Sequence, residues 1–395
     1  MALMQATFGP AASAPDTRAA GSILILTIAA FALLTTEFII LGVLPGLARD
    51  LNISITTAGY LVTLFAFTVM LVGPFLTAAI SHFDRKKTFL AILVIFALSN
   101  ALSTMASGFW SMAFSRLLAA IVLPVFWGTA SESAAQLAGR GNEGKAVARV
   151  YLGITAAFVF GIPLGTLAAA SVGWRGTFWI LAGLCLVIAV LMWRLMPQLP
   201  KAPAQQAGQR QSAILKDSRF VLHVVLSVVV FTAMFTAYTY LADMLERLAR
   251  IPSEQVGWWL MGFGAVGMIG NAIGGRLVER SPLGATMVLL IVLGAGMSAV
   301  GPTADRLWLL VVALATWGIA YTALFPVCQV RVMMAGAKAQ ALAGTLNVSA
   351  ANGGIGLGAA VGSVSIQHLG LVSLGWVGTA IAALALAMSW AMNRK

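Results

Sequence analysis

The chain has 395 residues, of which 60% are hydrophobic and only 9% are charged, whereas about 25% of residues are charged in a typical globular protein. The 24 Lys and Arg residues outnumber the 12 Asp and Glu residues, but they are scattered between long apolar runs and form no continuous basic face for nucleic acid. The composition excludes a water-soluble enzyme, a disordered chain and a disulfide scaffold, and it predicts an all-α integral membrane protein.

Twelve stretches of the sequence are long and apolar enough to cross a membrane as helices. About 20 residues, at about 1.5 Å per residue, span a hydrocarbon layer of about 30 Å. We expect the helices at 22–45, 56–80, 88–106, 109–135, 147–171, 175–197, 220–243, 255–278, 283–303, 306–329, 340–367 and 370–392. None of these stretches has the period of two that a membrane β-barrel strand requires, so the prediction is 12 transmembrane helices.

The distribution of Lys and Arg predicts the orientation of the chain, because short cytoplasmic loops retain basic residues. With the N-terminus inside, most basic residues fall in cytoplasmic loops, and the other side receives only Arg49, Arg175, Arg247, Arg250 and Arg306. We therefore expect both termini in the cytoplasm. Residues 1–21 lack the basic start and the small-residue cleavage site of a removable signal peptide, so we interpret them as a cytoplasmic tail.

A polar segment, residues 198–218, divides the chain into two parts with six expected crossings each. It contains Pro200, Pro203, Gln205, Gln206, Gln209 and Gln211, which is typical of a linker. We expect an N-terminal six-helix bundle at 22–197 and a C-terminal six-helix bundle at 219–395, related as an internal repeat. In the C-terminal half, glycines recur every four residues from Gly354 to Gly362 and predict a helix face on which a neighbouring helix packs closely.

Signs of an enzyme or of a metal site are missing from the sequence. Cys185 and Cys328 fall in expected spans of different halves, so we interpret them as buried free thiols without a metal. The three histidines, His82, His223 and His368, are isolated from one another and lie near the ends of expected helices, without the neighbours that would make a catalytic group. No G-x-x-x-x-G-K-[ST] phosphate loop is present, so ATP hydrolysis by this chain is not expected.

Short motifs along the expected spans carry a resemblance to a known family. They are Thr35-Thr36-Glu37-Phe38, Asp84-Arg85-Lys86-Lys87, Arg116, Gly161-Ile162-Pro163-Leu164-Gly165 and Thr236-Ala237-Tyr238-Thr239-Tyr240. In this order the chain resembles the major facilitator superfamily, in particular its drug/proton antiporter branch, which includes sugar (arabinose) efflux permeases. The resemblance implies two bundles around a central cavity in a bacterial cytoplasmic (inner) membrane. It also implies a monomer that uses the proton gradient as its energy source and needs no cofactor.

Glu37 is an ionisable residue in a run that otherwise contains apolar residues and threonines. A charge at such depth costs roughly 2.5–3.5 kcal/mol on insertion scales. Burial favours the neutral acid, so Glu37 is a candidate for taking up a proton on one side of the membrane and releasing it on the other. The alternative is a glutamate held by hydrogen bonds between helices.

Arg116 is the expected partner of Glu37. Counted from the outer ends of their helices, both residues lie roughly 10–12 Å deep. In the family fold both helices border the cavity, so we expect contact, or competition through a proton or a substrate. The alternative is a permanent ion pair that only fixes packing.

Further charged residues lie near the ends of the expected helices. A cytoplasmic latch, meaning ion pairs that break when the bundles rock, is expected from Asp84, Arg85, Glu132, Arg276, Glu279 and Arg280. Within it, Glu132 would pair with Arg85 or Lys86, although a solvated helix end explains Glu132 equally well. Asp243 and Glu246 are expected at the solvated outer rim, beside Arg247 and Arg250.

The resemblance places a substrate near the middle of the membrane. The candidate binding residues are Thr36, Trp127, Tyr238, Tyr240, Tyr321, Gln329, Asn347 and Asn352. A mostly apolar wall with few polar groups suits a neutral or weakly polar molecule better than a dianion.

These observations favour a secondary active transporter that exports a small organic solute, a sugar or an amphipathic drug-like compound, by alternating access in exchange for protons. A purine or nucleoside exporter of the same superfamily is one alternative. A solute channel or facilitator without proton coupling is the other.

Overall fold

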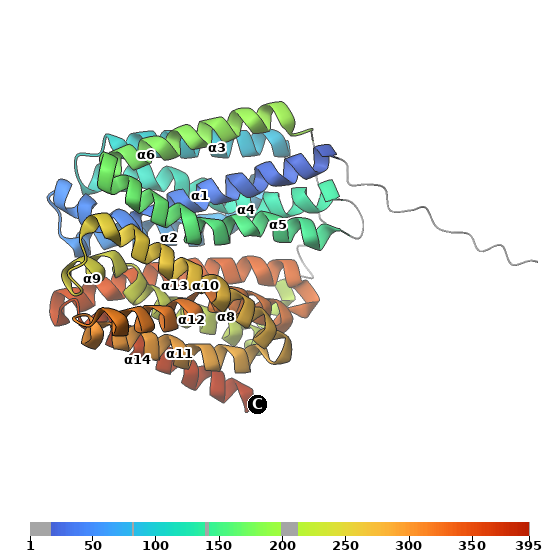
Figure 1. The fold of residues 1–395 in the computed structure, drawn as a ribbon. Helices are drawn as coiled ribbons and strands as arrows, with labels where there is room; N and C mark the ends of the chain where they lie inside the picture. Colours follow the sequence, from blue (N-terminus) through green and yellow to red (C-terminus); the bar gives the residue numbers. More distant parts are fainter. Residues whose placement is uncertain (1–16, 81–82, 139–141, 199–211, 395) are drawn as a thin grey trace, which may run out of the picture.

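A computed structural model describes residues 17–80, 83–138, 142–198 and 212–394, and every regular element in these ranges is a helix (Figure 1). Most of the expected tail and of the expected linker therefore lies outside the described residues. The first group of helices comprises α1 (Thr17–Asp50), α2 (Ile55–Ile80), α3 (Arg85–Thr104), α4 (Phe109–Ala138), α5 (Glu143–Ala156) and α6 (Ile162–Leu195). The second group comprises α8 (Ser218–Tyr238), α9 (Leu241–Arg247), α10 (Ser253–Arg280), α11 (Pro282–Thr303), α12 (Leu307–Ala335), α13 (Gln340–Leu369) and α14 (Ser373–Asn393).

Ten helical segments in the described ranges are long and apolar enough to span a membrane. Of the twelve expected spans, two fall in a single segment and one is not among the ten. The stretches 147–171 and 175–197 fall in one 51-residue run, Lys145–Leu195, and α13 is missing because its asparagines and glycines lower its hydropathy. The count of twelve crossings thus stays a prediction.

Gly173 interrupts the long run between α5 and the end of α6. Its backbone has φ +74° and ψ 163°, a combination that is essentially restricted to glycine. The hydroxyl of Thr177 donates a hydrogen bond to the carbonyl oxygen of Gly165, twelve residues earlier, at 3.2 Å. The chain therefore folds back at Gly173, which separates the two spans expected from the sequence.

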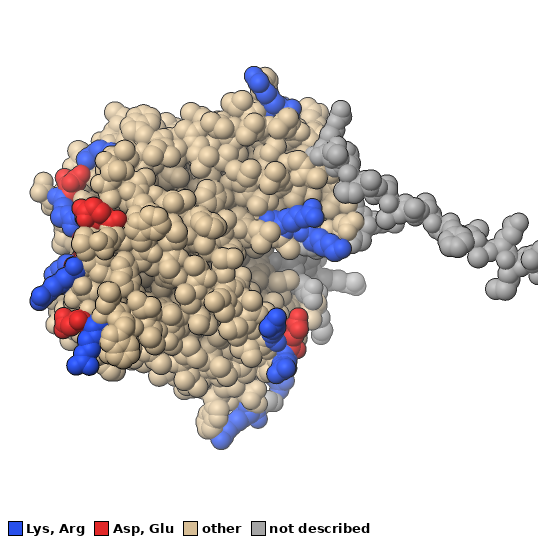
Figure 2. Space-filling view, in the orientation of Figure 1, with Lys and Arg blue, Asp and Glu red and all other residues tan. Residues whose placement is uncertain are grey.

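The helices lie in two layers in Figure 1, with the first group above and the second group below. The second group packs against the first chiefly through α13 on α2 and α10 on α6. Lys, Arg, Asp and Glu gather at the two ends of the face drawn in Figure 2, and the band between them shows none. Many large apolar side chains are exposed, among them Trp193 and Ile291, and this pattern suits a surface that faces lipid.

The glycines of α13 bring it into close contact with α8, as the sequence predicts. A Cβ atom placed on Gly358 would lie 2.8 Å from the carbonyl oxygen of Thr232 and 2.9 Å from Cβ of Phe235. Cys185 and Cys328 are buried free thiols, which confirms that interpretation as well.

Replacing Gly358 by alanine is expected to destabilise the protein, because the new methyl group meets the backbone of α8. Overpacking of this kind costs about 1–3 kcal/mol. Gly183→Ala is the matched control, since a Cβ there meets no atom within 4 Å and alanine favours a helix. Thermal unfolding in detergent should show a lower midpoint for Gly358→Ala and an unchanged or higher one for Gly183→Ala. Equal midpoints would contradict the close α8–α13 contact.

Candidate functional site

A cavity of about 370 Å³ lies between the two groups of helices. Its lining runs from Gly264 to Asn271 in the middle of α10 and from Thr322 to Val330 in the second half of α12. The polar residues of its wall are Glu37, Trp127, Tyr151 and Thr155 from the first group, and Asn271, Thr322, Gln329, Asn347 and Asn352 from the second. No Lys or Arg is among the described residues that line it.

Glu37 on α1 lies in this wall and is 8% exposed. Within the described ranges, no hydrogen bond or ion pair reaches its carboxylate. Its neighbours in the wall include Leu34 and Phe38 of the same helix and Val69 of α2. The carboxyl group therefore stands alone in a largely apolar surface beside the cavity.

Arg116 on α4 contacts α1 through the main chain and not through the acid. One guanidinium nitrogen, Nη1, donates to the carbonyl oxygen of Thr36 at 2.6 Å, and Nη2 donates to that of Glu37 at 2.7 Å. The guanidinium carbon also lies 4.7 Å from the centre of the Phe65 ring. Among the described residues the two side chains form no ion pair, so Arg116 holds α1 by its main chain and acts on the Glu37 carboxylate only through its charge.

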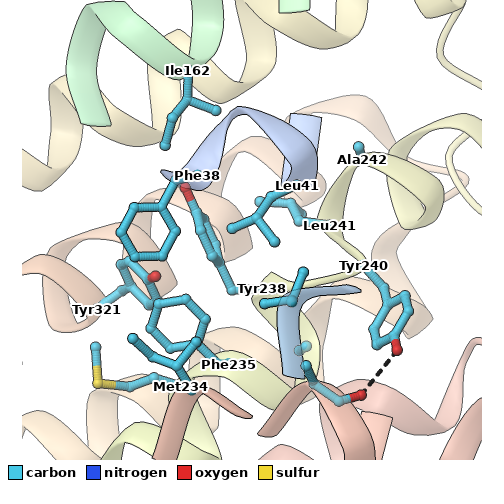
Figure 3. Packing of buried hydrophobic residues seen from close by; sticks show 14 of the residues in the cluster. Phe38, Leu41, Ile162, Met234, Phe235, Tyr238, Tyr240, Leu241, Ala242 and Tyr321 are labelled. Atoms are coloured by element: carbon cyan, nitrogen blue, oxygen red, sulfur yellow. Dashed lines mark hydrogen bonds between the residues drawn. The ribbon is translucent and has the colours of Figure 1, made fainter. Parts of the chain in front are cut away.

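The cavity brings together four of the eight expected substrate residues, namely Trp127, Gln329, Asn347 and Asn352. Thr36 is absent from its lining because the hydroxyl is buried and accepts a hydrogen bond from Nδ2 of Asn100 at 3.1 Å. Tyr240 is also absent, because its hydroxyl donates to the carbonyl oxygen of Ala359 at 2.9 Å (Figure 3).

Tyr238 and Tyr321 belong to an aromatic cluster and not to the cavity lining. Their rings stack at 4.3 Å between centroids (Figure 3). The cluster consists of Phe38, Phe158, Phe231, Phe235, Tyr238, Phe263, Trp317, Tyr321 and Phe325. Phe38 of α1 lies 5.9 Å from Phe235 of α8, ring centre to ring centre. Because rings at such distances attract one another, the cluster holds the two groups together beside the cavity.

Sequence reasoning missed four polar residues of the wall: Tyr151, Thr155, Asn271 and Thr322. Tyr151 and Thr155 are spaced four residues apart, so they share a helix face, and that spacing was a usable signal. Asn271 is a single amide within an apolar, glycine-rich helix, and its isolation in that run was also a usable signal. The hydroxyl of Thr322 donates to the carbonyl oxygen of Gly267 at 2.5 Å, which ties α12 to α10.

The residues expected to form the latch are only partly brought together. Nη2 of Arg85 lies 2.5 Å from Oε2 of Glu132, a pair within the first group that does not reach the second group. Asp84 instead caps α3, where its carboxylate accepts from the backbone N–H of Lys87 at 2.9 Å. On α10, Arg276, Glu279 and Arg280 are exposed, and within the described ranges they form no ion pair.

Several polar contacts link the two groups away from the cavity. Nη1 of Arg49 lies 2.9 Å from Oε2 of Glu246. The hydroxyl of Thr63 donates to the carbonyl oxygen of Gly356, and that of Ser363 donates to the carbonyl oxygen of Thr56, each at 3.1 Å. These contacts close the groups against each other at the end that carries Arg49.

The expectation that Asp243 lies at the solvated outer rim is wrong. Its residue is only 3% exposed, because α9 folds in against α1 and α10. Its carboxylate lies 3.4 Å from Nη1 of Arg247, as expected from the sequence. Glu246 is the residue that pairs across the groups, with Arg49 and not with Arg250.

Comparison of the sequence with known proteins identifies the family of the chain, and comparison of the structure shows a similar fold. A family profile described as Major Facilitator Superfamily matches residues 26–333. The "Inner membrane transport protein YdhP" of Escherichia coli O157:H7 is 32% identical over 374 residues, which cover 94% of this chain and 96% of the relative. The "Probable sugar efflux transporter" of Helicobacter acinonychis is 29% identical over 92% of this chain and 93% of the relative. A bacterial homologue of the human lysosomal transporter Spinster has a similar fold, with a TM-score of 0.78 at 16% identity over 96% and 98% of the two chains.

Replacing Arg116 by alanine is expected to loosen α1, because two hydrogen bonds from a charged donor are lost and a space remains. Each such bond contributes about 1.5–3 kcal/mol, and truncation of a large buried side chain adds a further cost. We expect a loss of about 2 kcal/mol or more, measured as a lower thermal midpoint in detergent. Arg276→Ala, at an exposed site, should leave the midpoint unchanged. If both variants have the same thermal midpoint as the wild type, the contact between Arg116 and α1 does not stabilise the protein.

Proposed function

Because the chain belongs to the major facilitator superfamily, we propose that it exports a small organic solute, a sugar or an amphipathic drug-like compound, in exchange for protons. It is a membrane transport protein and not an enzyme. In this proposal the chain crosses the bacterial inner membrane twelve times, with both termini in the cytoplasm. The name of the Helicobacter relative supports the sugar as cargo.

The observation that carries the proposal is the unpaired carboxyl group of Glu37 in the cavity wall. A buried carboxyl group in an apolar surface, without a hydrogen bond or an ion pair, favours its neutral form, and contact with water favours ionisation. Exposure of the cavity to one compartment after the other therefore loads and unloads a proton at this position. Coupling arises when solute and proton compete for the same cavity.

The packing of the two groups supports alternating access. The aromatic cluster and the Arg49–Glu246 pair hold them together on one side of the cavity. An exposed ion pair of this kind contributes only about 0–1 kcal/mol, and the other polar links are hydrogen bonds to main-chain carbonyls. Such contacts can be exchanged for contacts with water when the groups tilt, which suits a carrier that opens on two sides in turn.

Glu37→Gln is expected to abolish proton-coupled export while the protein still folds and inserts, because glutamine keeps the size of the side chain and cannot release a proton. The measurement uses proteoliposomes with a pH-sensitive dye inside and a screen of sugars, nucleosides and cationic drugs for solute-dependent proton movement. Glu254→Gln, which changes an exposed carboxylate in the first turn of α10 and outside the cavity lining, is the matched control and should keep wild-type coupling.

Solute exchange without a gradient provides the second arm of the experiment. Glu37→Gln should retain exchange of labelled for unlabelled solute, because the cavity is intact. Undiminished export against a concentration gradient by Glu37→Gln would refute the proposal.

A further inference from the structure

The two groups contribute different chemistry to the cavity wall. The first group supplies the single acid, Glu37, together with Trp127, Tyr151 and Thr155. The second group supplies carboxamides from three helices, α10, α12 and α13. A carboxamide carries no charge and offers both an N–H donor and a carbonyl acceptor. This side of the wall therefore recognises hydrogen-bonding groups and not ionic ones.

Asn347 and Gln329 form a pair across two helices of this wall. Nδ2 of Asn347, on α13, donates to Oε1 of Gln329, on α12, at 2.6 Å. The carbonyl oxygen Oδ1 of Asn347 is buried and has no hydrogen-bond partner. The amide pair thus leaves one acceptor of Asn347 unused.

Asn352 has the same property one and a half turns further along α13. Its Nδ2 donates to the carbonyl oxygen of Val348 in its own helix at 3.1 Å, and its Oδ1 is buried without a partner. Among the described residues that line the cavity, Asn347 and Asn352 are the ones that carry such an unpaired buried atom. Buried acceptors are rarely left unpaired in native structures, and these two differ from the other unpaired atoms of the described residues in belonging to residues that line the cavity, where a ligand can bring donors.

Resting on the proposed function, we propose that Gln329, Asn347 and Asn352 form a subsite that binds hydroxyl groups of a neutral, polyhydroxylated solute. A hydroxyl group donates to an unpaired carbonyl oxygen and can accept from an amide N–H. The opposite wall offers rings, including Trp127 and Phe158, against which the C–H face of such a solute packs.

The subsite lies on the helix that also joins the two groups. One turn beyond Asn352, the carbonyl oxygen of Gly356 accepts the hydrogen bond from Thr63 of α2. A Cβ on the intervening Gly353 would lie 2.8 Å from the sulfur of Met70 on α2. A solute bound to Asn352 therefore contacts the same turn of α13 that packs against the first group.

The test measures equilibrium binding to the purified full chain of L-arabinose, D-xylose and D-glucose, each with its monodeoxy analogues. Wild type is expected to bind at least one parent sugar on the order of tenfold more tightly than one of its deoxy analogues, because a buried amide without its partner penalises binding. Asn352→Ala should weaken the parent to the level of that analogue and bind the analogue unchanged. Asn347→Ala, a second variant, should likewise lose discrimination at one hydroxyl. Gln367→Ala removes an exposed amide from the same helix and should change nothing.

Equal affinity of wild type for every parent and deoxy analogue, or no binding of any of these sugars, would overturn the subsite. Equal weakening of parent and analogues by Asn352→Ala would also overturn it, since that result indicates a purely structural role. The two proposals fail separately. If cationic drugs drive proton movement and sugars do not bind, the exporter stands without the subsite. If sugars bind with discrimination but Glu37→Gln still exports uphill, the subsite stands without proton coupling at Glu37.

Discussion

The arrangement depends on how Arg116 uses its hydrogen-bond donors. Two of them go to main-chain carbonyl oxygens of α1, at Thr36 and Glu37. A buried guanidinium group needs acceptors, and an adjacent carboxylate is the usual one. Because the backbone supplies them here, the arginine anchors α1 without neutralising the acid. The carboxyl group of Glu37 therefore lies at the cavity, and the other described polar residues of the cavity wall are uncharged.

A second constraint is the contrast between the sides of the cavity. On one side, aromatic rings from α1, α8, α10 and α12 pack together with the π-helical turn that contains Phe158. The burial of apolar surface that accompanies these contacts is non-directional. The amides of α12 and α13, by contrast, have fixed directions. The cavity thus combines an apolar part with a polar part whose hydrogen-bonding groups have fixed directions.

Local features of the sequence predicted the helices and the acid, while long-range packing decided the rest. Glu37 was recognisable because it is the one acid in an apolar run, and Asn347 and Asn352 because amides are rare in such runs. Tyr238, Tyr240 and Tyr321 were not separable from cavity residues, since the direction of each ring depends on helices far away in the sequence. The burial of Asp243 followed from a break in the helix at Thr239 and Tyr240, which apolar spacing alone does not reveal.

The chain reverses direction at Gly173 with almost no loop between two neighbouring helical segments. Gly173 alone makes the connection, and the hydrogen bond from the hydroxyl of Thr177 to the carbonyl oxygen of Gly165 joins the two segments next to it. The segment that includes Phe158 at the cavity and the segment that ends at Leu195 therefore form a stiff hairpin. In a carrier whose two groups tilt, such a hairpin would move as one piece, so a change at the cavity would also shift the segment that ends at Leu195.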